Sequence, residues 1–199
     1  MATISASFSQ SLDGFIALPD DSVDHIFDWY DAGDTEVHWP GNPMVSRTSP
    51  QSAAHLEEII AGAGALVVGR RVFDHTDGWG GSHPAGVPVF VVTHSVPTAW
   101  VEAHPDAPFT FVTDGLERAV EQAAAVAGPD GTVGLAGPNI AQQCLAAGLL
   151  DEVRIDLAPV LLGEGIRFFE PFETGAILLD DPEVVEGVRV THLRYRIRH

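Results

Sequence analysis

The stretch TVGLAGPNIAQQCLAAGLLDEVRIDLAPVLLGEGIRFFE, residues 132–170, decides the fold of this chain. Its apolar run 133–136 predicts a buried strand, and the tripeptide Gly137-Pro138-Asn139 breaks that strand. Apolar residues then recur at the spacing of a helix: Ile140, Cys144 and Ala147, with Leu145 beside them. The segment therefore predicts a strand, a glycine turn and a helix in direct succession.

A second strand follows this helix, because apolar and polar residues alternate from Val153 to Leu157. We expect two unlike faces, with Arg154 and Asp156 on the polar one. The glycine turn before the helix collects free backbone N–H groups and the positive end of the helix dipole. Such a turn binds anions, most often phosphate, although many turns of this kind only connect two elements.

Composition limits the class of protein. The chain has 199 residues, of which 45% are apolar, and this suffices for the core of one compact α/β domain. A net charge of −18 argues against nucleic acid and anionic membranes as partners. No apolar run could span a bilayer, and the N-terminus does not resemble a signal peptide. With Cys144 as its one cysteine, the chain fits a reducing cytoplasm.

All ten basic residues are arginines, since the sequence contains no lysine. Schiff-base chemistry and P-loop phosphate binding both need an amine and are therefore excluded. A bound anion must be held by arginine, backbone N–H groups or hydroxyls. The scattered histidines lack the spacing of a zinc site, so no metal is expected, and no G-x-S-x-G elbow of a serine hydrolase occurs.

The remaining elements favour an α/β fold with a mostly parallel central sheet and an antiparallel C-terminal hairpin. Strands are expected at 3–10, 65–68, 87–93 and 109–113, helices at 50–61 and 114–127, and two antiparallel strands within 176–197. Asp114 and Glu117 have the spacing of a capping box for the second of these helices. In the last strand, Leu193, Tyr195 and Ile197 should face inward, and Arg194, Arg196 and Arg198 outward. Residues 19–48 are expected to form an irregular insert with one helical turn near 23–30.

Four motifs in this order carry a family resemblance: SLDGFIA (11–17), VVGRRVFD (67–74), VPVFVVTH (87–94) and GLAGPNIAQQCLAAGLLDEVRIDLAPVLLGEG (134–165). Together they resemble the dihydrofolate-reductase-like superfamily, and most closely the RibD C-terminal reductase domain of riboflavin biosynthesis. The resemblance implies a three-layer fold, a single domain over residues 1–199, and a homodimer. The apolar pairs Leu161-Leu162 and Phe168-Phe169 could serve the dimer contact or belong to the core.

The resemblance also implies NADPH as the cofactor, with its phosphates at the turn Ala136, Gly137, Pro138, Asn139 and Ile140. Pro138 departs from the family pattern and removes one N–H donor. Further cofactor-binding residues implied are Gly69, Arg70 and Arg71 beside the adenosine-side phosphates, Thr93 and His94 near the ribose phosphate, and Ser9, Ile16 and Ala17 against the nicotinamide. For Arg70 and Arg71 a surface ion pair with Asp74 or Asp77 is the alternative.

Asp13 is the expected catalytic and substrate-binding carboxylate, and its alternative role is to cap its own turn. Trp79 is the expected stacking residue for a flat ring, whereas Trp29 and Trp39 are expected to pin the insert onto the core. Dihydrofolate reductases carry a pterin-binding acid where this chain has Ala53-Ala54, which argues against folate reduction.

These features predict an NADPH-dependent reductase with a small-molecule heterocyclic substrate. A pyrimidine like 5-amino-6-(5-phosphoribosylamino)uracil is the first candidate. The alternatives are an orphan pterin, folate or flavin reductase, and a non-catalytic dinucleotide-binding protein of the same fold.

Overall fold

The computed structural model describes residues 1–171 and 175–198, and one large sheet forms its centre. The strands of this sheet are β1 (Thr3–Ser11), β5 (Ala63–Gly69), β6 (Val89–Val92), β7 (Phe109–Val112), β8 (Thr132–Ala136), β9 (Glu152–Ala158), β11 (Glu183–Gly187) and β12 (Val190–Arg196). Their order is β11-β12-β9-β1-β8-β5-β6-β7. All neighbours from β9 to β7 are parallel, whereas β12 is antiparallel to both β9 and β11. The mostly parallel sheet with an antiparallel C-terminal hairpin is thus confirmed.

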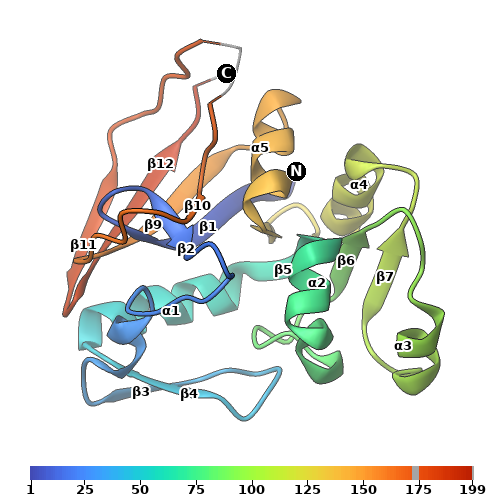
Figure 1. Ribbon diagram of the computed structural model, residues 1–199, viewed down its shortest axis with the longest axis horizontal. Helices are drawn as coiled ribbons and strands as arrows, with labels where there is room; N and C mark the ends of the chain where they lie inside the picture. The colour runs from blue at the N-terminus through green and yellow to red at the C-terminus, as the bar shows by residue number, and fades with distance from the viewer. Residues whose placement is uncertain (172–174, 199) are drawn as a thin grey trace.

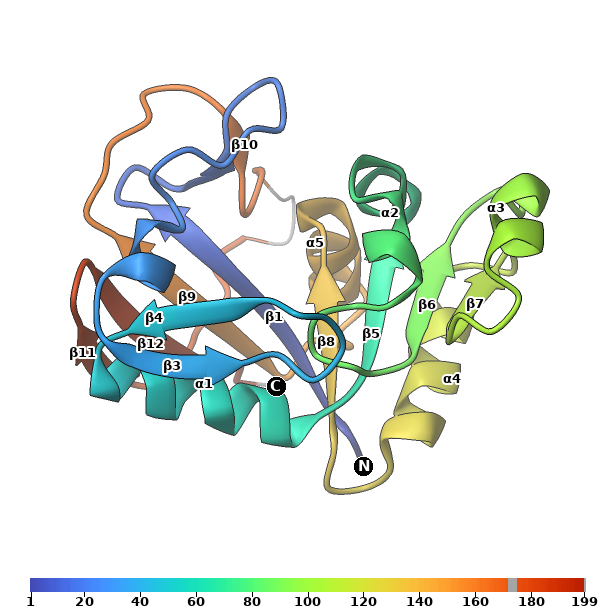
Figure 2. The ribbon, with the colours of Figure 1, turned by 90° about the horizontal axis from the view of Figure 1, so that it is seen from below.

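The helices form a layer on each side of the sheet. They are α1 (Pro50–Gly62), α2 (Arg70–His75), α3 (Thr98–Ala103), α4 (Leu116–Ala127) and α5 (Pro138–Ala146). Figure 1 shows α4 and α5 on one side of the sheet and α1 on the other, and Figure 2 shows the same arrangement from below. The three-layer fold expected from the resemblance is confirmed. No helix among the described residues is long and apolar enough to cross a membrane.

An apolar core fills the space between the sheet and the pair α4 and α5. The strands contribute Ala6, Val133, Leu135 and Val153, and the helices contribute Val120 and Ile140. Cys144 belongs to this core and is fully buried. Burial, together with the charge of Glu117, raises the pKa of the Cys144 thiol to about 12, so this cysteine is a packing residue. Phe168 is also part of this core and is 1% exposed, so it does not supply a dimer contact.

The opposite face of β1, β9 and β12 is polar and lies beneath α1. Strand pairing places polar residues in rows across the three strands: Ser9 beside Asp156 beside His192, and Ser7 beside Arg154 beside Arg194. The expectation of two unlike faces for β9 holds, but the polar face is buried too. Arg194 does not face outward as expected, because its Nε donates to the buried Glu152 at 2.8 Å.

The insert 19–48 is more regular than its composition indicates. It contains a 3-10 turn η1 (Asp28–Asp31) and an antiparallel hairpin of β3 (Thr35–His38) and β4 (Val45–Thr48). The expectation of an irregular segment was therefore wrong for the hairpin, whereas the helical turn expected near 23–30 lies at 28–31. Trp29 is 1% exposed and donates from Nε1 to Ser9 Oγ, while Trp39 donates to Ser46 Oγ. The hydrogen bond of Trp39 lies within the insert, but its ring packs against the cluster that includes Leu56 and Val190, so both tryptophans hold the insert on the core, as predicted.

The predicted capping box at α4 is absent. The helix begins at Leu116 after Gly115, whose φ of 106° only glycine adopts readily, and no side chain caps it. Gly115 therefore takes the N-cap position, which leaves Asp114 outside the helix and puts Glu117 too close for a capping box. The predicted inward face of α4 is confirmed, because Leu116, Ala119, Val120 and Ala123 are buried.

Candidate active site

A cleft of about 660 Å³ lies at the C-terminal ends of β1, β5 and β8. Ligands of open α/β sheets bind at this end of the strands. Most of the cofactor-binding residues predicted from the sequence line it together: Ser9, Ile16, Ala17, Gly69, Arg70, Arg71, Ala136, Gly137, Pro138, Asn139 and Ile140. Residues far apart in the chain thus meet on one concave surface.

The start of α5 forms one end of the cleft. Gly137 has a φ of 109°, and a Cβ there would lie 3.2 Å from Val72 Cγ2, so both conformation and space favour glycine. Pro138 occupies the first helical turn and has no N–H to donate. The N–H groups of Asn139 and Ile140 also lie in that turn, where no intrahelical acceptor exists and no side chain caps them. Two N–H donors and the positive end of the dipole suit a phosphate here.

Arg70 is the first residue of α2 and lies beside this turn in the cleft. Its guanidinium donates to Asp74 Oδ1 at 2.7 Å, to Ser95 O at 2.9 Å and to Thr93 Oγ1 at 3.3 Å. Thr93 itself does not line the cleft, and neither does His94. Thr93 instead supports Arg70 from behind, and the cation is already oriented before any ligand binds.

Arg71 bridges the mouth of the cleft. Its Nη2 donates to both carboxylate oxygens of Asp21, at 2.9 and 2.8 Å, and both residues line the cleft. Asp21 lies in the loop after β2 (Phe15–Ala17), so the ion pair joins this loop to α2. The alternative for the two arginines, an ion pair with Asp74 or Asp77, is found for Arg70, which pairs with Asp74, whereas Arg71 pairs with Asp21.

The other end of the cleft is mostly apolar. Ile16 and Ala17 come from β2, which pairs with β10 (Ile166–Arg167), and Ile166 also lines the cleft. Gly165 allows this close approach, because a Cβ there would collide with Ala17 O. The hydroxyl of Ser9 is already used, since it accepts the hydrogen bond from Trp29. These walls exclude water without contributing a reactive side chain.

Sequence reasoning missed the residues that form the floor and outer wall of this end. The insert contributes Val23, Phe27 and Tyr30, and β9 contributes Asp156. Burial and the neighbouring charge of Asp156 raise the pKa of the Tyr30 hydroxyl, which stays protonated. The aromatic run 27–30 in an otherwise polar insert was the available signal for this wall.

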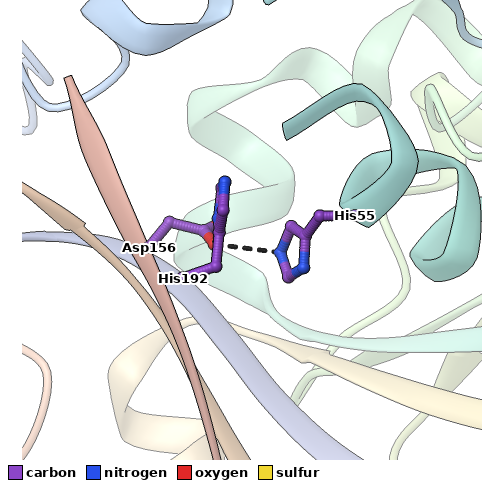
Figure 3. Close-up of side chains that lie close together, drawn as sticks. All are labelled: His55, Asp156 and His192. Atoms are coloured by element: carbon purple, nitrogen blue, oxygen red, sulfur yellow. Dashed lines mark hydrogen bonds and ion pairs between the residues drawn. The ribbon is translucent and has the colours of Figure 1, made fainter. Parts of the chain in front are cut away.

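Asp156 forms a cluster with two histidines, shown in Figure 3. Its Oδ1 lies 2.7 Å from His192 Nδ1 and 3.1 Å from His55 Nε2. The two imidazole rings stack with centroids 3.9 Å apart, and Ser52 Oγ lies 2.9 Å from His192 Nε2. Burial by itself raises the pKa of Asp156, but the hydrogen bonds from His192 and His55 outweigh it and hold the pKa below its ordinary value.

Comparison with known proteins gives the family. The sequence matches the RibD C-terminal domain over residues 2–184. The chain belongs to this family. No curated protein matches the chain.

Solved structures share the fold of this RibD C-terminal chain. A protein assigned to riboflavin biosynthesis from Shewanella sp. PV-4 has 22% identity and a TM-score of 0.71 over 100% of both chains. RibD of Acinetobacter baumannii, form 2, has 14% identity and a TM-score of 0.63, covering 100% of this chain and 58% of that one. Dihydrofolate reductase of Enterococcus faecalis, complexed with NADP(H), has 15% identity and a TM-score of 0.55, covering 99% and 97%. The recognition of a dihydrofolate-reductase-like fold is confirmed.

Asp13 of the family motif SLDG does not line the cleft. Its carboxylate accepts from Ser11 Oγ at 2.6 Å, from Gly163 N at 2.7 Å and from Leu162 N at 3.1 Å. The Ser11 hydrogen bond, assisted by the two backbone donors, lowers the pKa of Asp13 to about 2 despite some desolvation. This carboxylate ties the turn after β1 to the VLLGEG loop, whereas the alternative role expected for it was to cap its own turn. With its lowered pKa it has no proton to donate near neutral pH.

Trp79 also lies outside the cleft. It sits in the 3-10 segment η2 (Asp77–Gly81), with its ring 4.7 Å from that of His83, and packs against the cluster around Phe73. The structure therefore gives Trp79 a packing environment and places aromatic residues of the insert, Phe27 and Tyr30, at the cleft instead.

Proposed function

We propose that this chain is an NADPH-dependent reductase of a flat nitrogen heterocycle. The observation that carries the proposal is the convergence of the glycine turn before α5, Arg70 and the apolar wall of β2 on one cleft. Membership of the RibD C-terminal family supports a reductase. NADPH, when bound, supplies the hydride. The protein must bind the cofactor and the substrate, orient them toward each other and exclude water.

The residues present fit such a cofactor. Asn139 and Ile140 offer backbone N–H groups to the diphosphate, and Gly137 leaves room for it because no Cβ fills the turn. Arg70 and Arg71 offer the charge that a further phosphate on the adenosine side requires, which favours NADPH over NADH. Ile16 and Ala17 offer a flat apolar surface for the nicotinamide ring.

Binding of the cofactor is testable by quenching of tryptophan fluorescence. We expect NADPH to bind and NADH to bind much more weakly. Arg70→Ala should weaken NADPH binding by roughly tenfold or more, because a charge-assisted hydrogen bond contributes about 1.5–3 kcal/mol. Arg118→Ala is a matched control, since Arg118 is an exposed arginine on α4 paired with Glu121. An unchanged affinity in Arg70→Ala would show that the phosphates lie elsewhere.

The first substrate candidate is a ribosylaminopyrimidine of the riboflavin pathway, and the second is another ring, such as a pterin or flavin. A screen of reducible heterocycles, scored by the loss of NADPH absorbance, separates them. The alternative function is a dinucleotide-binding protein without chemistry, and the missing N–H donor at Pro138 favours it. Tight NADPH binding with no turnover in the screen would support that alternative. The homodimer stays a prediction that light scattering can test.

A further inference from the structure

Asp156 stands where the cleft meets a second cavity. This smaller cavity, of about 230 Å³, lies between the sheet and α1 and is lined by Leu56 and Ile59 of that helix. Ser7, Tyr30 and Asp156 line both cavities. Asp156 is therefore a carboxylate on the floor of the site, next to the apolar end where the substrate ring is expected.

The two oxygens of this carboxylate have different surroundings. Oδ1 accepts from both His55 and His192. Oδ2 makes no hydrogen bond within residues 1–171 and 175–198, yet it is not fully buried. In that part of the chain the one buried side-chain oxygen or nitrogen without a partner is Ser5 Oγ. Oδ2 therefore keeps access to the cavities and remains an unused acceptor on a residue that is 6% exposed.

The histidines fix the carboxylate in place and keep it ionised. His192 is 2% exposed and is itself held by Ser52, and the side chain of His55 is 12% exposed. Hydrogen bonds that favour the charged form of a buried acid offset part of its desolvation. The result is a negative acceptor whose position is set before a ligand arrives.

Two other interpretations of the cluster fit the geometry less well. Histidine and carboxylate ligands could hold a metal ion, and the ligating atoms lie within 4.8 Å of one another. The two ring nitrogens that would bind the ion, however, both already contact Asp156 Oδ1, at 2.7 and 3.1 Å, so the carboxylate oxygen lies at the point that an ion shared by the two rings would need. The order Ser52, His192, Asp156 also resembles a hydrolase triad, but Ser52 is 1% exposed and lines neither cavity.

We propose that Asp156 Oδ2 is the anchor for the substrate, and that it accepts from a cationic or N–H-donating edge of the ring, such as an amidine. A carboxylate or phosphate of the substrate cannot lie at this end, because it would meet an ionised and desolvated carboxylate. The inference rests on the proposed function, since it assumes that the reducible ring occupies the apolar end of the cleft.

Three planar probes of nearly equal shape test the anchor: benzamidinium, benzamide and benzoate. They carry a positive, a neutral and a negative group on the same ring. Each is titrated by calorimetry into protein saturated with NADPH. We expect benzamidinium to bind more tightly than benzamide, and benzoate not to bind. Asp156→Asn should weaken benzamidinium by about tenfold or more and change benzamide little, because a charge-assisted hydrogen bond becomes a neutral one.

Asp24→Asn is the matched control, because it removes the same charge from an exposed position in the insert. Equal weakening in both variants would show a general charge effect and overturn the anchor. Binding of benzoate as tight as that of benzamidinium to the wild-type protein would overturn it without any variant, which covers a failure of Asp156→Asn to fold. Visible absorption of bound Co²⁺ that His192→Gln abolishes would make the cluster a metal site and also overturn it.

Quenching of tryptophan fluorescence by NADPH, measured on the same samples, distinguishes a failure of the proposed function from a failure of the substrate anchor. If wild-type protein binds no NADPH, the proposed function fails. If NADPH binds equally to wild type and to Asp156→Asn while the preference for benzamidinium is the same in both, the anchor alone fails.

Discussion

The two faces of β1 and β9 are built from opposite chemistry although the same strands supply both. Toward α4 and α5 they present Ala6 and Val153, which join the apolar core. Toward α1 they present Ser7, Arg154 and Asp156, which line cavities. The first face stabilises the fold through apolar burial, which involves no titrating group and so does not depend on pH. The second must satisfy charges with partners, and its polar groups extend into the floor of the cleft.

Glu152 shows how the polar face is held together. It is 2% exposed, and its two oxygens accept from Arg154 Nε at 2.7 Å and from Arg194 Nε at 2.8 Å. Arg194 continues to Glu58 of α1 and Glu183 of β11, so one arginine connects the helix to the edge of the sheet. The apolar face needs no such pairing, because any well-packed neighbour serves a methyl group.

The largest expected effect comes from breaking this buried pair. Glu152→Ala leaves Arg154 and Arg194 without their shared carboxylate, which should lower the free energy of unfolding by about 3–5 kcal/mol. Urea denaturation measures the loss. A destabilisation below about 1 kcal/mol would show that water solvates these groups and that the polar face is not a closed core.

Lowering the pH should weaken the contribution of the polar face to stability and leave that of the apolar face unchanged. Burial tends to raise the pKa of Glu152, but the charges and hydrogen bonds of Arg154 and Arg194 lower it overall, as the two histidines do for Asp156. Folded pKa values below the unfolded ones mean that the unfolded chain binds more protons. These groups therefore stabilise the fold fully above about pH 5, and this contribution disappears as the pH falls through the folded pKa values.

Matched variants on the two faces make this measurable by urea denaturation at several pH values. Leu135→Ala on the apolar face should cost about 2–5 kcal/mol at every pH, because it creates a cavity without moving a charge. The cost of Glu152→Gln should be constant above about pH 5 and shrink as the pH falls below it, because the unfolded wild-type chain then takes up a proton that folded Glu152, with its lowered pKa, resists. Parallel pH curves for Glu152→Gln and the wild type would contradict the assigned pKa direction.

The sequence predicted the apolar face better than the polar one, for a physical reason. Apolar periodicity records which side of an element is buried, so Val133, Ile140 and Leu116 were assigned correctly. Polar alternation in β9 indicates a second face, but it does not show whether that face meets water or a helix. Only the register that aligns Asp156 with His192, and the placement of α1 above them, reveals the buried cluster.

In the candidate site, too, some features follow from local sequence and others only from the tertiary structure. The glycine turn at 137 and the arginine after Gly69 follow strands directly, so local sequence places them at the strand ends. Asp13 was expected beside the ring because the family resemblance places the S-x-D-G turn there, yet its carboxylate accepts from Leu162 and Gly163, which lie 149 and 150 residues away. Asp156 was not among the expected site residues, because it belongs to β9 and reaches the cleft only through the register of the sheet and its contact with His55 of α1.

The smallest effect is expected at the exposed ion pair of the cleft mouth, which contrasts with the buried pair of Glu152. The side chains of Arg71 and Asp21 are 72% and 30% exposed. Asp21→Asn should change the free energy of unfolding by less than about 0.5 kcal/mol, because water screens such a pair. NADPH affinity, measured by fluorescence quenching, should rise a few-fold, since Arg71 is released toward the phosphates. Glu121→Gln, which frees the exposed Arg118 on α4, serves as the control and should leave the affinity unchanged. A lower NADPH affinity in Asp21→Asn would contradict this and show that the ion pair between Arg71 and Asp21 itself holds the cofactor site in shape. An exposed ion pair would then matter for binding, as the buried pair of Glu152 matters for stability.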